Sequence, residues 1–321
     1  MTRQHSTAVY APASIGNFSV GFDVLGAAVR PADGTRLGDV VEARPATTFS
    51  LQVTGSHAHV VPEDPANNLV TAAYLRYVET LRKRRLPSRP LAVTLHKNLP
   101  VASGLGSSAA SIVAALVAIN QAHENTLENH DLLHLAAQLE GQVSGSSHFD
   151  NVAPALLGGL QLMTGQADNP AQSLPFPDHW RLVVSYPGTT MSTQQARSVL
   201  PVSVPMETAI DFGRRLASFV HYLHQEKPHQ AAALIHDVLA EPYRRALLPG
   251  YAAFSTAAKK AGALAVGVSG SGPSVFCLCD NPQTASIVQQ LAMETYCAHA
   301  EAGKTAFSHI CHLDTQGAHE L

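Results

Sequence analysis

The chain has 321 residues, of which 45% are hydrophobic and 14% are charged, with 21 basic against 24 acidic side chains and a net charge of −3. This length is enough for one large domain or two ordinary ones with a sizeable core. The chain lacks the basic excess that is typical of nucleic-acid binders, which argues against that class of protein. No segment approaches the roughly 18–20 uninterrupted apolar residues of a membrane helix.

The first half of the chain alternates between strand and helix patterns. Alternation in VVEARPATTFSLQV is typical of a strand, and apolar residues at helical spacing in NNLVTAAYLRYVETLRK are typical of a helix. In chain order, we expect strands at 6–12 and 37–54, a helix at 67–83, a strand at 91–99, and helices at 107–121 and 130–144.

The second half continues without a regular strand–helix repeat. We expect strands at 154–164 and 181–187, helices at 192–199, 207–225, 229–240 and 249–261, a strand–turn–strand at 265–280, a helix at 282–298 and a strand near 307–314. Short Gly-Pro turns between neighbouring strands favour mixed or antiparallel sheets and an α+β fold. The polar, Pro-rich stretch GQADNPAQSLPFPD predicts a boundary, which divides the chain into domains 1–168 and 169–321.

Several features have a plain structural interpretation beside a functional one. The basic cluster RKRR at 82–85 is either a solvated helix face or a polyanion site, and we favour the former. His130 and His134 have the spacing of two zinc ligands on one helix face, but no H-E-x-x-H pattern or third ligand supports a metal. The four cysteines near the end of the chain include an apolar C-x-C, and no signal-peptide core opens the chain; these features predict buried free thiols and a cytoplasmic location.

The stretch PVASGLGSSAA at 100–110 places glycines and serines directly before a strong helix pattern. It is neither G-x-x-x-x-G-K-[ST] nor G-x-G-x-x-G. Glycines nevertheless allow close approach of the backbone, and the helix that follows directs its positive end at the loop, so a phosphate chain could bind there without a basic side chain. The alternative is a plain turn before a packed helix.

Two further glycine and serine stretches accompany this loop: APASIGNFSVGFDVLGAAV at 11–29 and GVSGSGPSVFCL at 267–278. Together the three resemble the galactokinase, homoserine kinase, mevalonate kinase and phosphomevalonate kinase (GHMP) superfamily, whose signature P-x-x-x-G-L-G-S-S-A-A residues 100–110 match at every specified position. The resemblance covers essentially the whole chain. LEGQVSGSSHFDNVAPALLGGLQL and EPYRRALLPG are most similar to the homoserine kinase branch, particularly its proteobacterial form.

The resemblance implies a two-domain architecture: an N-terminal domain like the second domain of ribosomal protein S5, and a ferredoxin-like C-terminal domain. The active site would lie between them, where the three loops converge. The implied reaction is ATP-dependent phosphorylation of the L-homoserine hydroxyl, a step towards threonine, with Mg²⁺ as cofactor. A homodimer is also implied.

The resemblance places ATP and Mg²⁺ on one side of the site. Ser108 and Glu140 would hold Mg²⁺, although a solvated helix face is the alternative for Glu140, and Asn68 would contact adenine unless it serves as a helix N-cap. The triphosphate would bind the loop of Pro100, Val101, Ala102, Ser103, Gly104, Leu105, Gly106, Ser107, Ser108, Ala109 and Ala110.

The same resemblance assigns the amino-acid substrate. Arg197 and Arg244 would bind its carboxylate, because a guanidinium matches a carboxylate with two parallel hydrogen bonds; surface salt bridges are the alternative. Asn17 and Asp23 match amino-acid-binding positions, and an unpaired Asp23 in the apolar run FDVL would be costly unless it had a partner. Thr193 is a weaker candidate for orienting the hydroxyl.

Asn151 stands where some superfamily members carry a catalytic Asp, and an amide cannot act as a base. We expect the adjacent Asp150 to point elsewhere. The implied mechanism is therefore direct in-line attack without a carboxylate base, in which Asn151 orients the hydroxyl. Three alternatives remain: another superfamily kinase of the mevalonate type, a catalytically silent binding protein on this fold, and an α+β domain whose glycine loops are only turns.

Overall fold

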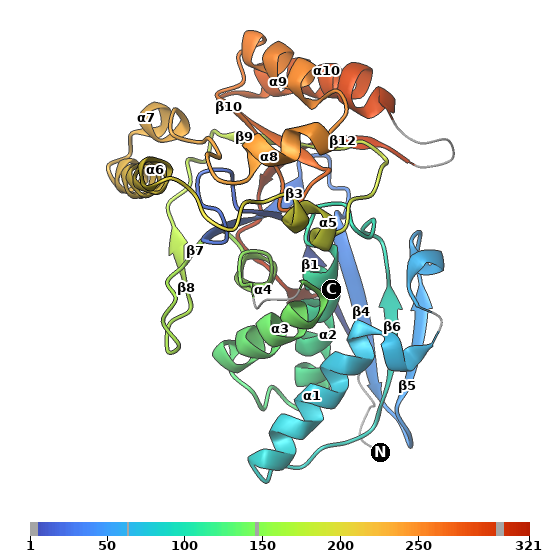
Figure 1. The fold of residues 1–321 in the computed structure, drawn as a ribbon. Coiled ribbons are helices and arrows are strands. Elements are labelled where there is room, and N and C mark those ends of the chain that lie inside the picture. The colour runs from blue at the N-terminus through green and yellow to red at the C-terminus, as the bar shows by residue number, and fades with distance from the viewer. Residues whose placement is uncertain (1–5, 63, 145–147, 300–304) are drawn as a thin grey trace.

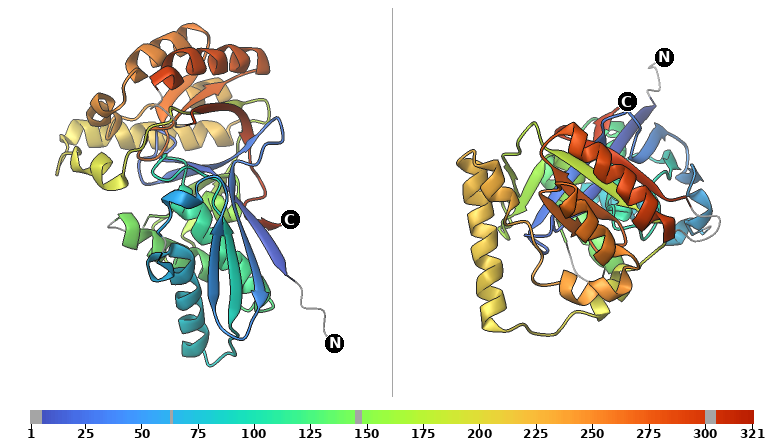
Figure 2. Two further views of the ribbon diagram at one scale, coloured as in Figure 1. Left: turned by 90° about the vertical axis from the view of Figure 1, so that its right-hand side faces the viewer. Right: turned by 90° about the horizontal axis from the view of Figure 1, so that it is seen from above.

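The computed structural model describes residues 6–62, 64–144, 148–299 and 305–321 (Figure 1). These residues form two β-sheets flanked by helices, which confirms the predicted α+β class. Figure 2 shows two lobes: the blue and green first half of the chain makes most of one, and the orange and red second half makes most of the other.

The first sheet belongs mainly to the N-terminal lobe. Its strands, in spatial order, are β13 (His319–Glu320), β1 (Thr7–Pro12), β4 (Gly38–Pro45), β6 (Leu91–His96) and β5 (Ser50–Thr54). All neighbours are antiparallel except β5 and β6, which are parallel and are connected through helix α1 (Leu69–Lys83). The strand predicted at 37–54 is therefore two strands, because the chain leaves β4 at Pro45 and pairs again on the far side of β6.

The second sheet crosses between the lobes. Its strands, in spatial order, are β10 (Ala265–Val268), β11 (Val275–Cys279), β9 (Arg181–Tyr186), β12 (Phe307–Leu313), β3 (Leu25–Pro31), β7 (Leu160–Met163) and β8 (Ala171–Leu174), and β2 (Ser14–Gly16) also pairs with β3. Both sheets thus contain strands from either side of residue 168, and the division at that residue stays a prediction.

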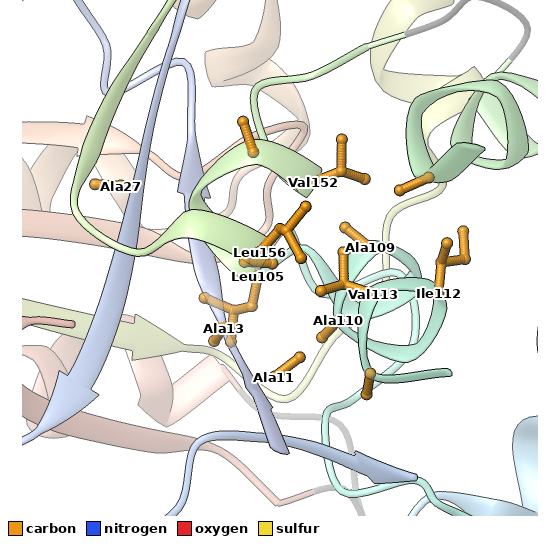
Figure 3. Close-up of a cluster of buried hydrophobic side chains, with 14 of the residues drawn as sticks. Ala11, Ala13, Ala27, Leu105, Ala109, Ala110, Ile112, Val113, Val152 and Leu156 are labelled. Carbon is orange, nitrogen blue, oxygen red and sulfur yellow. The ribbon is translucent and has the colours of Figure 1, made fainter. Parts of the chain in front are cut away.

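The helices of the first half pack on one another and on the first sheet. They are α1 (Leu69–Lys83), α2 (Ser107–Ala122), α3 (Asn129–Ser144) and α4 (Val152–Leu157). Helix α2 is apolar on nearly every side and is buried along its length, so it forms the centre of this lobe. Figure 3 shows Ala109 and Val113 of α2 beside Val152 and Leu156 of α4, with Ala11 of β1 close to them.

The helices of the second half are α5 (Thr193–Ser198), α6 (Met206–His224), α7 (Pro228–Ala232), α8 (Glu241–Arg244), α9 (Tyr251–Lys260) and α10 (Pro282–Leu291). A second apolar core lies between α9, α10 and the second sheet, where Phe254 and Tyr296 pack against Val183 and Val275. Helix α6 runs along a different side of the molecule, apart from α9 and α10 (Figure 2).

Three further predicted elements differ from the structure. The strand at 154–164 is wrong over its first half, because α4 continues to Leu157 and two left-handed glycines, Gly158 and Gly159, precede β7. The helix at 229–240 ends at Ala232, and the carboxylate of Asp237 accepts hydrogen bonds from the backbone N–H groups of Leu239 and Ala240, which replace helical bonds. The helix at 282–298 stops at residue 291 and continues as a π-helical turn.

The cysteine prediction is confirmed. Cys277, Cys279, Cys297 and Cys311 are all free thiols in the interior, and burial raises the pKa of each above its usual value. Across the described ranges, no helix combines the length and the apolar character required to cross a bilayer.

Candidate active site

A cavity of about 480 Å³ lies where the three glycine and serine loops meet. The first loop contacts the last through a hydrogen bond from the Gly270 N–H to the Gly16 carbonyl, 3.1 Å long. The middle loop contacts the last through Ser269 Oγ, which donates to the Gly104 carbonyl over 2.6 Å. The predicted side chains outside the middle loop all line this cavity: Asn17, Asp23, Asn68, Glu140, Asn151, Thr193, Arg197 and Arg244.

The middle loop divides between the cavity and the core. Its cavity-lining residues are Val101, Ala102, Ser103, Gly104, Gly106, Ser107 and Ser108. Those that do not line the cavity are Pro100, Leu105, Ala109 and Ala110, all of which are buried. Figure 3 shows the last three in the apolar cluster around α2. The four buried residues of the signature therefore anchor the loop in the core, and its remaining residues face the cavity.

The backbone of the middle loop is left-handed at three positions, Ala102 (φ 54°), Gly104 (φ 79°) and Gly106 (φ 65°). Gly106 is the N-cap of α2, so the sixteen-residue helix begins immediately afterwards at Ser107. The positive end of the α2 dipole and its first free N–H groups thus lie at the cavity wall, an arrangement that favours an anion.

Ser108 and Glu140 face each other across the cavity wall from α2 and α3. Ser108 Oγ donates a hydrogen bond to Glu140 Oε1 over 2.7 Å. Burial raises the pKa of Glu140, while this hydrogen bond and the positive charge of Lys97 oppose the rise. A carboxylate beside a hydroxyl oxygen is a donor set that Mg²⁺ accepts, so the two residues fit the predicted metal. Glu140 is not on a solvated helix face.

Asn68 combines the two roles that the sequence left as alternatives. It is the N-cap of α1, and its Oδ1 accepts a 2.8 Å hydrogen bond from the Val70 N–H. It also lines the cavity, and its buried amide nitrogen has no hydrogen-bond partner among the described residues. Capping therefore uses the Oδ1 of Asn68 and leaves its Nδ2 as a hydrogen-bond donor for a ligand in the cavity.

Asp23 and Arg197, which both line the cavity, pair with each other. Arg197 Nη2 lies 2.9 and 3.1 Å from the two carboxylate oxygens of Asp23. Asn17 fixes this turn, because its Oδ1 accepts from the Asp23 N–H over 2.8 Å while its Nδ2 donates to the Gly270 carbonyl over 3.0 Å. Thr193, the first residue of α5, lies one turn before Arg197.

His148 completes this group and was missed in the sequence. Its Nδ1 lies 3.7 Å from Asp23 Oδ1, and burial lowers its pKa while Asp23 opposes the shift. The ligand atoms of Asp23, His148 and Asp150 all lie within 4.8 Å of one another. Two carboxyl groups and an imidazole at this distance suit a cationic group. The only signal in the sequence is that His148 lies three residues before Asn151.

Arg244 lies in the interior, and its neighbour Arg245 does not. Arg244 is 3% exposed and donates to the carbonyls of Gly270 over 3.0 Å and Ala196 over 3.1 Å, and burial lowers its pKa. Arg245 is half-exposed and pairs with Glu241 over 2.9 Å. The structure therefore brings the predicted arginine, and not the adjacent one, into the cavity.

Phe22 is a second residue that the sequence did not single out. Its ring lies under both guanidinium groups, 5.9 Å from that of Arg197 and 5.6 Å from that of Arg244. The face of an aromatic ring attracts cations, so the ring stabilises two like charges that converge on one side of the cavity.

Asn151 and Asp150 both line the cavity, which makes the expectation that Asp150 points elsewhere wrong. Asn151 already has helical φ and ψ at the start of α4, so adjacent side chains diverge less than the 180° of a strand. Asn151 Oδ1 accepts from Ser14 Oγ over 2.9 Å, and its Nδ2 donates to Asp150 Oδ2 over 3.2 Å. Burial, followed by the charges of Asp23 and Glu140, raises the pKa of Asp150 to about 7.

The other candidate features have structural roles in the described residues. The Nε2 atoms of His130 and His134 both lie within hydrogen-bond distance of the Ala167 carbonyl, at 2.9 and 2.8 Å, so these two rings hold a loop. The basic cluster at 82–85 is exposed, and Arg84 pairs with Asp131. Both observations agree with the plainer interpretation of each motif.

Comparison with known proteins agrees with the resemblance of the motifs. The model of the GHMP kinase N-terminal domain matches residues 68–159, and that of the GHMP kinase C-terminal domain matches residues 219–293. A homoserine kinase structure from Cytophaga hutchinsonii has 32% sequence identity and a TM-score of 0.89, and the match covers 100% of this chain and 99% of the other.

More distant structures share the fold. A putative homoserine kinase from Listeria monocytogenes has 21% identity and a TM-score of 0.68 with 99% of each chain covered, and a galactokinase from Lactococcus lactis has 14% identity and a TM-score of 0.71 with 99% of this chain and 95% of the other covered. The motifs, the two-sheet architecture and the full-length similarity to the Cytophaga hutchinsonii enzyme lead to one conclusion: the chain belongs to the GHMP kinases, small-molecule kinases that use ATP as phosphoryl donor.

Proposed function

We propose that this kinase phosphorylates L-homoserine on its hydroxyl, forming O-phospho-L-homoserine for threonine biosynthesis. The observation that carries the proposal is the charge pattern of the cavity lining outside the phosphate loop. Buried Arg244 and half-buried Arg197 suit a carboxylate, and Asp23, with His148 and Asp150 close by, suits an ammonium. An amino acid is a substrate that needs both partners, whereas mevalonate has no ammonium group.

Substrate binding would exchange the internal ion pair for two intermolecular ones. Arg197 and Asp23 now neutralise each other over 2.9 Å, which limits the cost of burying them. A zwitterion can replace that pair by giving its carboxylate to Arg197 and Arg244 and its ammonium to Asp23. Phe22 keeps both guanidinium groups in place during the exchange.

Asn151 would orient the substrate hydroxyl, because Ser14 and Asp150 fix both ends of its amide. The hydroxyl oxygen then attacks the γ-phosphorus of ATP in line with the leaving group, so that the new O–P bond forms as the bond to ADP breaks, and the hydroxyl proton passes late to an oxygen of the transferred phosphoryl group. Ser108 and Glu140 would hold Mg²⁺, which when bound would neutralise charge on the transferring phosphoryl group. The transition state of phosphoryl transfer is usually loose, so little deprotonation of the hydroxyl is needed and no carboxylate base is required.

The test is a coupled assay of ADP release with Mg-ATP and three conditions: L-homoserine, mevalonate and no acceptor. We expect acceleration by L-homoserine alone. Arg244→Ala should raise the KM for homoserine by about 100-fold, because a charge-assisted pair is lost, while the adjacent Arg245→Ala should stay near the wild type. Turnover of mevalonate, or equal effects of the two substitutions, would contradict the assignment. ATP binding without turnover of any acceptor would favour a silent binding protein.

A homodimer and a cytoplasmic location stay predictions. Sedimentation equilibrium at several protein concentrations tests the first, with a mass of twice 34.0 kDa expected. Fractionation of cells that express the tagged chain tests the second.

A further inference from the structure

A buried ion pair between Asp39 and Lys97 lies next to the phosphate loop, and neither residue is part of the function proposed above. Asp39 is the second residue of β4 and is 0% exposed, and Lys97 follows the last residue of β6 and is 3% exposed. Lys97 lines the same cavity as the loop. A lysine close to a phosphate loop is ordinarily assigned to the phosphates themselves.

The contacts of Lys97 argue against that assignment. Its Nζ donates to the carboxylate of Asp39, to the Ser107 carbonyl over 2.9 Å and to Ser111 Oγ over 3.0 Å. An ammonium group has three N–H donors, and these three acceptors use all of them. A phosphate could bind Lys97 only by displacing one of these buried contacts.

The contacts of Asp39 connect the two ends of the loop. Its Oδ1 accepts from the backbone N–H groups of Asn98 over 2.8 Å and Leu99 over 2.9 Å, directly before the loop begins at Pro100. Its Oδ2 accepts from Ser111 Oγ over 2.6 Å, one turn after the start of α2 at Ser107. One carboxylate therefore fixes the entry of the loop relative to its exit.

The loop needs such an external constraint. Its backbone is left-handed at Ala102, Gly104 and Gly106, and Ala102 adopts that conformation without the freedom of glycine. Strained segments keep their conformation only where the surrounding structure determines it. Asp39 and Lys97 supply this constraint at the two ends of the loop, while Ser269 and Ser274 donate hydrogen bonds to the carbonyls of Gly104 and Ser103 within it.

We propose that Asp39 and Lys97 are positioning residues that hold loop 100–106 and the start of α2 in the form that binds phosphate, and that Lys97 makes no phosphate contact itself. The proposal rests on the ATP-binding role of the loop and names the residues that make it possible. Asp39 carries a negative charge, but Lys97 and not Asp39 lines the cavity. According to the proposal, Asp39 therefore favours the binding of an anion.

The experiment compares Lys97→Met, Asp39→Asn and the milder Ser111→Ala with the wild type, and uses Lys83→Met on the exposed face of α1 as a control for the loss of one lysine. Two quantities are measured: hydrogen exchange of the amides of residues 101–107 without nucleotide, and the dissociation constants of ATP and adenosine. Adenosine reports the cavity without the phosphate loop, so the ratio of the two constants isolates the loop.

We expect Lys97→Met and Asp39→Asn both to accelerate exchange in the loop and to weaken ATP binding by at least about tenfold, because small displacements of binding groups have large effects. Adenosine binding should change less than threefold. Ser111→Ala should shift both readouts in the same direction by a smaller factor, and Lys83→Met should leave them unchanged.

Two results overturn the proposal. If Asp39→Asn leaves ATP binding unchanged or tightens it while Lys97→Met weakens it, Lys97 is a phosphate ligand. If the variants lose thermal stability but keep the exchange of the loop and the ATP-to-adenosine ratio, the pair is structural only. Where the charge variants do not fold, unchanged exchange in Ser111→Ala has the same meaning. Failure of the wild type to bind ATP would refute the proposed function, while the exchange data would still test the positioning.

Discussion

Gly104→Ala tests how closely the phosphate loop packs against the last loop. A Cβ at this position would lie 2.6 Å from the Ser269 carbonyl oxygen and 2.7 Å from that of Gly272, and both are backbone atoms that cannot rotate away. An L-residue at its φ of 79° costs about 1–2 kcal/mol, and overpacking costs about 1–3 kcal/mol. We therefore expect a loss of about 2–5 kcal/mol in the free energy of unfolding, measured in urea.

The activity of Gly104→Ala should fall together with its stability, because the phosphate loop and the last loop must move apart to make room for the new Cβ. A displacement approaching 1 Å at a binding loop costs about 100-fold in rate, so we expect that loss in kcat/KM for ATP. Gly270→Ala is the matched control: its φ is also left-handed at 56°, but the nearest atom to its Cβ is the Gly104 carbonyl oxygen at 3.4 Å. It should lose only the conformational cost of about 1–2 kcal/mol. Equal losses in the two variants would refute the argument from close packing.

Three further substitutions test the rest of the site. Glu140→Gln should lower kcat by about 100-fold or more and raise the Mg²⁺ concentration needed for half-maximal activity, which a magnesium titration measures; an unchanged magnesium dependence would contradict the metal role. Asp150→Asn should lower kcat less than tenfold, because the mechanism needs no base. The pKa of Asp150, about 7 in the folded protein, is above the usual value near 4, so the folded state holds a proton that the unfolded state releases between these pH values. In urea unfolding, the wild type should therefore lose stability relative to the variant as pH rises from about 4 to about 7. Phe22→Leu should raise the KM for homoserine about five- to thirtyfold through the loss of two cation–π contacts, to Arg197 and Arg244, each worth about 0.5–1 kcal/mol, with kcat unchanged in the ADP assay.

The sequence predicted the parts of the site that depend on local pattern. Gly104 and Gly106 indicated a tight loop before a helix, and the structure has left-handed backbone at both positions. The family signature could not separate residues that face the cavity from residues that anchor the loop. Leu105 and Ala109 belong to the second group, because neighbours in three dimensions, not spacing along the chain, decide which side of a loop is covered.

The contacts that could not be predicted from the sequence connect residues that are far apart in the chain. Asp39 and Lys97 meet because β4 and β6 are adjacent in the sheet, and pattern alone gives no pairing of strands. Likewise, Phe22 lies under Arg197 and Arg244 only once the two halves of the chain have assembled. The short strands β8 and β13 were also missed, since neither has enough residues to show an alternating pattern.

The pairing of β13 with β1 has a consequence for the order in which the protein forms during synthesis. Among the described strands, β1 is synthesised first, and its partner on the outer edge, residues 319–320, is synthesised last. Until translation has passed that point, the outer edge of β1 lacks its native partner, and unpaired strand edges are sites where chains associate wrongly. Completion of this sheet therefore has to wait for the synthesis of residues 319–320.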